Sequence, residues 1–125
     1  MRIAVFDLTD CEGCEVILLS LQDELLEFST KHELVNFRFI SDYSSQGPFD
    51  LTFIEGMVSK EEDIKKIKYL RESSKVIVTL GTCAMTGGIN AILKRESERQ
   101  VAAAKIYSSD YKLKSLTAEP VDKYI

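Results

Sequence analysis

Three runs of strand length constrain the fold of this sequence more than any other feature. They are Arg2–Leu8, Asp50–Ile54 and Lys75–Leu80. The first and third are apolar almost throughout, which is typical of strands in a parallel sheet that is covered on both faces. Segments of helical periodicity separate the runs. This alternation indicates right-handed crossovers and a doubly wound α/β fold, with a mostly parallel sheet and helices on both faces.

Two segments carry the helical periodicity most clearly. The first runs from Gly13 to Ser29 and is expected to pack one narrow face on the sheet; this face consists of Ile17, Leu18, Leu21, Leu25 and Phe28. A second apolar line on the same helix, Leu19 and Leu26, is either ordinary surface or a contact with a partner. The other helix begins at Ser59, where Ser59 and Glu62 form a capping box, and continues to Ser73. Its buried stripe is expected to consist of Ile64, Ile67 and Leu70.

The remaining segments give weaker signals. Alternating side chains from Leu34 to Ile40 predict an edge strand. The mixed charges of Lys94–Arg99 predict a solvated helical face that Val101–Ala104 continues.

Composition restricts the class of protein. With 125 residues and 45% hydrophobic content, the chain suits one domain over residues 1–125. A net charge of −4 without a run of Lys or Arg gives no footprint for nucleic acid. The N-terminal apolar run is too short for a signal peptide or a membrane span, so we expect a cytoplasmic location. Three cysteines in such a chain favour metal or catalytic thiols over a disulfide framework.

Two of those cysteines lie in the segment Asp10-Cys11-Glu12-Gly13-Cys14-Glu15, directly after the first strand. Two thiolates at this spacing can bind one metal centre, and Gly13 is expected to let the backbone curl under the sulfurs. Taken alone, the spacing fits zinc, an iron–sulfur cluster or a redox disulfide equally well.

The third cysteine follows another strand, in the glycine-rich segment Gly81–Ile89. In an open parallel sheet, ligands bind outside the carboxyl ends of the strands. Cys11, Cys14 and Cys83 are therefore expected at the same rim. Glu55-Gly56 ends the strand between them in chain order, and its glycine allows a close backbone approach.

These three motifs, in this order, resemble the small subunit of cytoplasmic nickel–iron hydrogenases, which is related to the 20 kDa-type subunit of complex I. The resemblance covers Met1 to about Leu93 and implies a flavodoxin-like domain. It implies that Cys11, Cys14 and Cys83 are three of the four ligands of the proximal [4Fe-4S] cluster, with Glu55 and Gly56 beside it.

The resemblance also implies a non-catalytic, electron-transfer role. The active-site metal belongs to the hydrogenase large subunit, and further electron-carrier subunits of the nicotinamide, F420 or heterodisulfide reductase type complete the complex. No catalytic residue is expected in this chain.

The sequence departs from the family pattern in one respect. The fourth cluster ligand of the family lies in a Gly-Cys-Pro motif beyond Glu119–Asp122, and no cysteine follows Cys83 here. We therefore expect a domain that is incomplete at its C-terminus. Asp10 and Glu15 are the nearest alternative ligands.

Other functions remain as alternatives. A complex I-like quinone oxidoreductase subunit would carry paired adjacent cysteines, which this chain lacks. A structural zinc domain would use the same thiols. A thiol–disulfide oxidoreductase would leave Cys83 unused, and the acidic residues around Cys11 and Cys14 disfavour the reactive thiolate.

Overall fold

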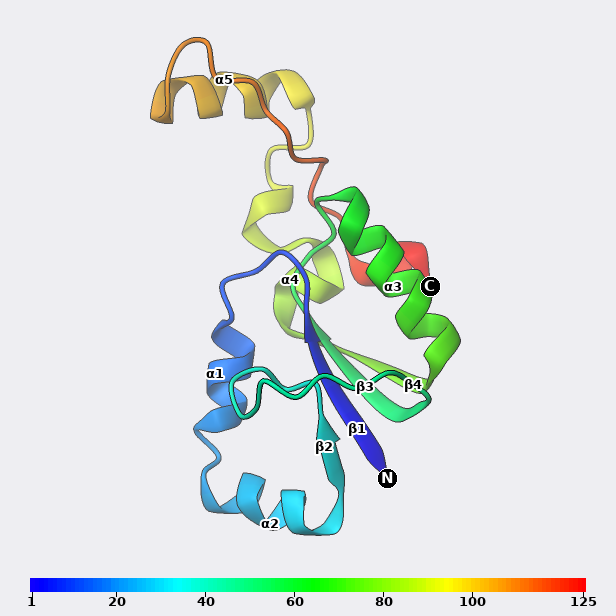
Figure 1. Ribbon diagram of the computed structural model, residues 1–125. Coiled ribbons are helices and arrows are strands. Elements are labelled where there is room, and N and C mark those ends of the chain that lie inside the picture. The colour runs from blue at the N-terminus through cyan, green and yellow to red at the C-terminus, as the bar shows by residue number, and fades with distance from the viewer.

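Four parallel strands form the centre of the computed structural model, which describes residues 1–125 (Figure 1). They are β1 (Arg2–Asp7), β2 (Glu33–Val35), β3 (Phe49–Glu55) and β4 (Ser74–Leu80). The spatial order is β2-β1-β3-β4, and every neighbouring pair is parallel. The predicted parallel α/β architecture is thereby confirmed, and the three runs that predicted it are β1, β3 and β4.

The helices lie on both faces of this sheet (Figure 1). Helices α1 and α2 cover one face, and α3 with the short η2 covers the other. The full set is α1 (Gly13–Leu19), α2 (Asp23–Lys31), α3 (Glu61–Ser73), α4 (Gly81–Thr86), η1 (Gly88–Ala91), α5 (Glu96–Ile106) and η2 (Val121–Tyr124). None of them combines the length and the apolar character that a membrane span requires.

The predicted helix from Gly13 to Ser29 is wrong as a single element, because it is broken between α1 and α2. Gln22 adopts a φ of +44°, and the Ser20 hydroxyl donates to the Ile17 carbonyl at the end of α1. Such local side-chain bonds compete with helix continuation. The break leaves Ile17 66% exposed and Leu21 46% exposed, so the expected buried face is only partly covered.

The edge strand is also shorter than predicted. β2 is at the edge of the sheet, as expected, but it ends at Val35. Asn36 then adopts a left-handed φ of +57°, which a strand cannot accommodate. The Asn36 side chain instead binds the backbone of Ser45 at both its N–H and its carbonyl.

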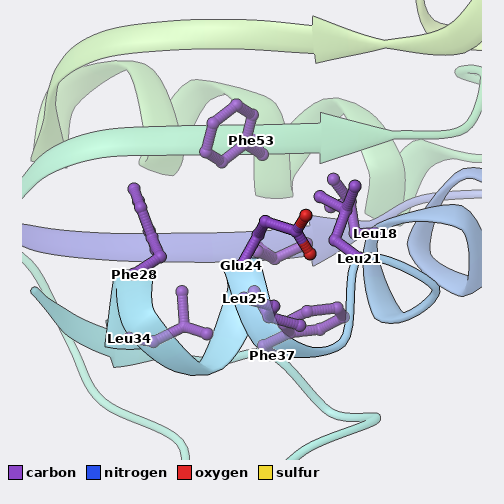
Figure 2. Close-up of a pocket in the computed structure, with 9 residues that line it drawn as sticks. Leu18, Leu21, Glu24, Leu25, Phe28, Leu34, Phe37 and Phe53 are labelled. Carbon is purple, nitrogen blue, oxygen red and sulfur yellow. The ribbon is translucent and has the colours of Figure 1, made fainter. Parts of the chain in front are cut away.

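Packing differs between the two faces of the sheet. On the α3 face the core is closed, and Ile67, Leu70 and Val121 are fully buried. On the α1–α2 face a cavity of about 270 Å³ remains (Figure 2). Glu24 is its one charged lining residue; the others are Val5, Leu18, Leu21, Leu25, Phe28, Leu34, Phe37 and Phe53.

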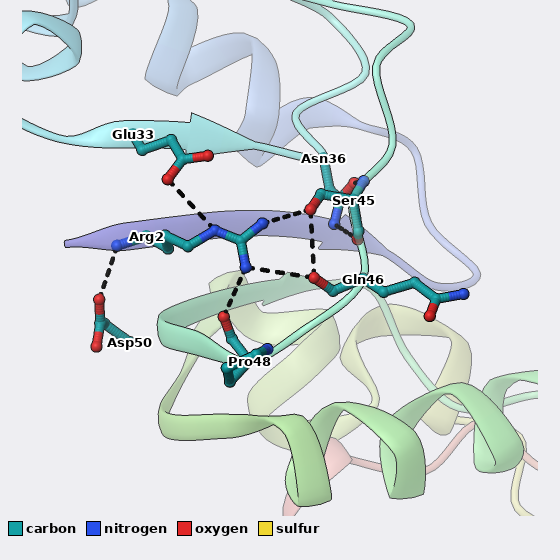
Figure 3. A network of polar contacts seen from close by, with 7 residues as sticks. All are labelled: Arg2, Glu33, Asn36, Ser45, Gln46, Pro48 and Asp50. Atoms are coloured by element: carbon teal, nitrogen blue, oxygen red, sulfur yellow. Dashed lines mark hydrogen bonds and ion pairs between the residues drawn. The ribbon is translucent and has the colours of Figure 1, made fainter.

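Arg2 anchors the amino ends of the strands, at the edge opposite the cysteines (Figure 3). Its guanidinium pairs with Glu33 at 3.3 Å and donates to the Pro48 carbonyl at 2.9 Å. It also donates to the Gln46 carbonyl and the Ser45 hydroxyl. One side chain thus ties β1 to β2 and to the loop that precedes β3.

The predicted capping box of Ser59 and Glu62 at the start of α3 is wrong. The helix begins at Glu61, and the buried carboxylate of Asp63, not that of Glu62, accepts the N–H groups of Ser59 and Lys60 at 3.0 and 3.1 Å. Of the predicted stripe, Ile67 and Leu70 are buried and Ile64 is partly buried against the core.

The predicted solvated helix is α5, which leads away from the sheet (Figure 1). The chain then returns toward α3, held by bonds from the Arg99 guanidinium to the carbonyls of Ser115 and Leu116.

Candidate metal centre at the carboxyl edge of the sheet

The loops that follow β1 and β3 are joined to one another at the carboxyl edge of the sheet. The Leu8 N–H donates to the Glu55 carbonyl at 2.9 Å, and Thr9 and Met57 exchange two backbone bonds. The Thr9 hydroxyl also donates to the Asp63 carboxylate at 2.9 Å. The backbone that leads into the first two cysteines is therefore held in place from β3 and α3.

The turn between Cys11 and Cys14 differs from the predicted one in detail. Glu12, and not Gly13, adopts the left-handed conformation, with φ +61°. Gly13 begins α1, and a Cβ there would lie 3.3 Å from the Cys11 sulfur. The absence of a side chain at Gly13 therefore makes room for a thiol, while the turn itself is made at Glu12.

Glu55, the last residue of β3, binds the first turn of α1. Glu55 is 2% exposed, and its two carboxylate oxygens accept the N–H groups of Cys14 at 3.0 Å and Glu15 at 2.7 Å. These donors have no partner within the helix, and a negative charge at this end is favourable. The prediction placed Glu55 at this rim, but it did not foresee these bonds.

Each thiol lies against a glycine. A Cβ on Gly81 would overlap the Cys14 sulfur, and a Cβ on Gly88 would lie 2.8 Å from the Cys83 sulfur. Both glycines have positive φ values, of 75° and 62°, which side chains other than hydrogen disfavour. The sequence signal for this arrangement was the glycine-rich segment around Cys83, although the pairing of Gly81 with Cys14 needed the tertiary structure.

Gly56 makes the close approach that its position predicted. With φ +93°, it packs so tightly that a Cβ would lie 2.9 Å from Oδ2 of Asp10 and 3.0 Å from the Thr9 carbonyl. Its contact is therefore with the loop before Cys11 and not directly with a thiol.

The three thiols influence one another electrostatically. Burial, the Glu55 carboxylate and the thiols of Cys11 and Cys83 raise the pKa of Cys14 to about 11. Burial and the charges of Cys11 and Glu55 also raise the pKa of Cys83. A thiol–disulfide oxidoreductase needs a cysteine whose pKa is lowered, not raised. The raised pKa values of Cys14 and Cys83 therefore argue against that alternative. A bound cation would supply the charge that favours the thiolates.

Three cysteine thiols are a donor set that fits an iron–sulfur cluster, whose usual protein ligands are thiolates. All three cysteines are free thiols, but no group of three His, Cys, Asp or Glu side chains lies close enough together to hold one metal ion. In a [4Fe-4S] cluster each cysteine binds a different iron, so the sulfurs lie farther apart than around a single ion. His32 takes no part, because it ends α2 beside Phe28.

Two acids of the segment Asp10–Glu15 are shielded from water, Glu15 completely and Asp10 in part. Burial and the charges of nearby acids raise the pKa of Glu15 to about 7 and that of Asp10 to about 6. Glu15 is 1% exposed, and one carboxylate oxygen of each residue is buried without a hydrogen-bond partner. No local pattern signalled this burial, because acids in a first helical turn are ordinarily solvated.

Known families and structures resemble this chain. The sequence model of the family described as NADH ubiquinone oxidoreductase, 20 Kd subunit, matches residues 11–125. The chain belongs to this family. Its resemblance to hydrogenase small subunits is also confirmed, because similar members of the 20 Kd subunit family are subunits of hydrogenases.

Two of these relatives align with the whole of this member of the 20 Kd subunit family. The sulfhydrogenase 2 subunit delta of Pyrococcus furiosus is 31% identical over 126 residues, covering 100% of this chain and 52% of that protein. The delta subunit of the NAD-reducing hydrogenase HoxS of Cupriavidus necator is 27% identical over 125 residues, covering 100% of this chain and 57% of that protein. The chain thus spans little more than half the length of these two relatives.

A solved structure supports the fold of this 20 Kd subunit family member. The chain matches a crystal structure of NAD+-reducing [NiFe]-hydrogenase in the H2-reduced state with a TM-score of 0.80 and 22% identity. The match covers 99% of this chain and 76% of the solved one. The α/β fold predicted from the sequence is thereby confirmed.

Proposed function

We propose that this chain is the electron-transfer subunit of a cytoplasmic nickel–iron hydrogenase and carries its proximal [4Fe-4S] cluster. The observation that carries the proposal is the position of Cys11, Cys14 and Cys83 at one edge of the sheet, each beside a glycine. The named hydrogenase relatives support the same interpretation.

The roles of the residues follow from their geometry. The three thiols would hold the cluster, which supplies one-electron transfer when bound. Gly81 and Gly88 let the backbone approach the sulfurs, and Glu55 fixes the start of α1. Cysteine occupies three ligand positions, so the proposal requires a fourth ligand that is not one of these three cysteines, and Asp10 and Glu15 are the nearest candidates in this chain.

The proposed partner is the large subunit, which would hold the active-site metal. Large apolar side chains are exposed on both sides of the cysteines: Val16 and Ile17 on α1, and Met85, Ile89 and Ile92 after Cys83. Exposed apolar groups that gather in one region mark an interaction site. We place the docking face here, with nicotinamide, F420 or heterodisulfide reductase type carriers completing the complex.

Leu19 and Leu26 are a second proposed contact with the large subunit. Leu26 is 65% exposed, and both residues line a groove between α2 and β2. Leu19→Glu combined with Leu26→Glu is expected to abolish copurification with the large subunit while leaving the circular dichroism spectrum unchanged. Full recovery of the complex with the double variant would show that Leu19 and Leu26 are ordinary surface residues.

Anaerobic reconstitution with iron and sulfide tests the cluster. We expect brown protein with broad absorption at about 400 nm but fewer than four irons per chain, because the sequence supplies only three of the four cysteine ligands. Cys11→Ser, Cys14→Ser and Cys83→Ser should each lower the bound iron, whereas Thr82→Ala, an exposed neighbour of Cys83, should not. A colourless protein with one zinc per chain would instead establish the structural zinc alternative.

The complex I-like alternative is supported by the description of the family itself. The absence of paired adjacent cysteines and the hydrogenase names of the relatives favour the hydrogenase role. In either role the chain passes electrons and performs no chemistry on a substrate. The isolated chain should therefore show no hydrogen-dependent dye reduction, and robust turnover would contradict the proposal.

A further inference from the structure

Glu55 is a buried carboxylate that no cation neutralises. It is 2% exposed and takes part in none of the ion pairs of the chain. Burying a charge without a counter-ion is costly unless the charge is fully hydrogen-bonded. The two backbone N–H groups of Cys14 and Glu15, at 3.0 and 2.7 Å, supply those bonds.

The position of Glu55 in the sheet explains how it reaches them. It is the last residue of β3 and pairs in register with Asp7 of β1 and Leu80 of β4. The chain that leaves β1 leads to Cys11 and Cys14, and the chain that leaves β4 leads to Gly81 and Cys83. Glu55 therefore lies between the two segments that carry the thiols.

Cys14 is fixed at two points by this arrangement. Its N–H donates to Glu55, and its sulfur lies against the backbone of Gly81. Without the carboxylate, these two donors in the first turn of α1 would lose their acceptor, and the sulfur would lose the anchor that sets its direction.

We propose that Glu55 is a positioning residue: by binding the N–H groups of Cys14 and Glu15, it holds the Cys14 sulfur against Gly81 and places a fixed negative charge beside the metal centre. The positioning role concerns the chain alone. The electrostatic role rests on the proposed function, since it needs a bound cluster.

Amide hydrogen exchange tests the positioning role on the chain without metal. We expect slow exchange at Cys14 and Glu15, and in Glu55→Ala at least tenfold faster exchange at both amides, with α3 unchanged. Glu55→Gln retains one acceptor oxygen and should expose only one of the two amides. The matched control is Glu61→Gln, an exposed carboxylate at the start of α3. If Glu55→Ala leaves the exchange rates of both amides unchanged, the proposal is overturned. If Glu55→Ala does not fold, unchanged exchange rates at both amides in Glu55→Gln overturn it instead.

The reduction potential of the reconstituted cluster tests the electrostatic role. Removing a negative charge favours the more negative, reduced cluster, so Glu55→Gln should raise the potential by about 59 mV, a tenfold change in the one-electron equilibrium. A merely structural role would leave the potential unchanged, and this result would overturn the electrostatic role. If the chain binds no cluster even when a fourth ligand is supplied, the proposed function fails, while hydrogen exchange still decides whether Glu55 holds α1.

Discussion

Filling the cavity on the α1–α2 face should stabilise the protein, whereas the same change in the closed core should destabilise it. Val5→Ile adds one methylene group at a residue that is 3% exposed and lines the cavity of about 270 Å³ (Figure 2). Burial of one methylene contributes about 0.8 kcal/mol. Val121→Ile adds the same group at a fully buried residue of the closed core, where overpacking costs about 1–3 kcal/mol.

The two substitutions form a matched pair, because both are Val→Ile and both sites are shielded from water. Their unfolding free energies should therefore differ by about 2–4 kcal/mol, the sum of the two opposite effects. Urea unfolding followed by circular dichroism measures this difference, provided that the slope m is the same for all three proteins. Equal effects of the two substitutions, or destabilisation by Val5→Ile, would refute the reasoning that the two faces are packed differently.

Further predictions concern Arg2, the buried acid Glu15 and Gly81. Arg2→Met removes the bonds that the Arg2 guanidinium makes in Figure 3 and should lower the unfolding free energy by about 1–3 kcal/mol. Lys31→Met, which removes an exposed pair with Glu27, should cost less than about 0.5 kcal/mol in the same urea titration. Because the pKa of Glu15 is raised from 4.5 to about 7, the folded protein keeps a proton that the unfolded chain has lost. This contribution to stability is complete below about pH 4.5 and is lost as the pH rises through about 7, so Glu15→Gln should reduce the fall in the urea midpoint between about pH 5 and about pH 8; an equal fall in the variant would contradict the pKa. Gly81→Ala, at φ +75° and against the Cys14 sulfur, should cost about 1 kcal/mol or more and reduce the iron bound on reconstitution, while the exposed Asn90→Ala should do neither.

Regular structure was predictable where local pattern and tertiary packing agree. The apolar run of β1 is buried inside the sheet as predicted, and the stripe of Ile67 and Leu70 follows from helical geometry alone. The prediction of a covered strand was wrong for β4, because β4 lies at the edge of the sheet and its Val76 is 52% exposed. The rim position of the three cysteines was predictable for a similar reason, since parallel strands place their carboxyl ends at one edge.

The predictions failed where a single backbone angle interrupted a continuing pattern. The apolar periodicity passes through Gln22 without change, yet a φ of +44° there divides the helix into α1 and α2. Asn36 ends β2 in the same way, because its side chain binds Ser45, nine residues away. Asp63 replaced Glu62 as the helix cap because it also meets Thr9, from a distant loop.

The amino-acid sequence by itself determined the α/β class, the alternation of strands and helices, and the three thiols at one rim, because these depend on periodicity and on where strands end. Only the tertiary structure decided which groups meet at that rim. Cys14 and Gly81 are 67 positions apart by their numbers, and Glu55 binds α1 across 41 and 40 positions. Contacts of this kind depend on the register of three neighbouring strands, which no local pattern encodes.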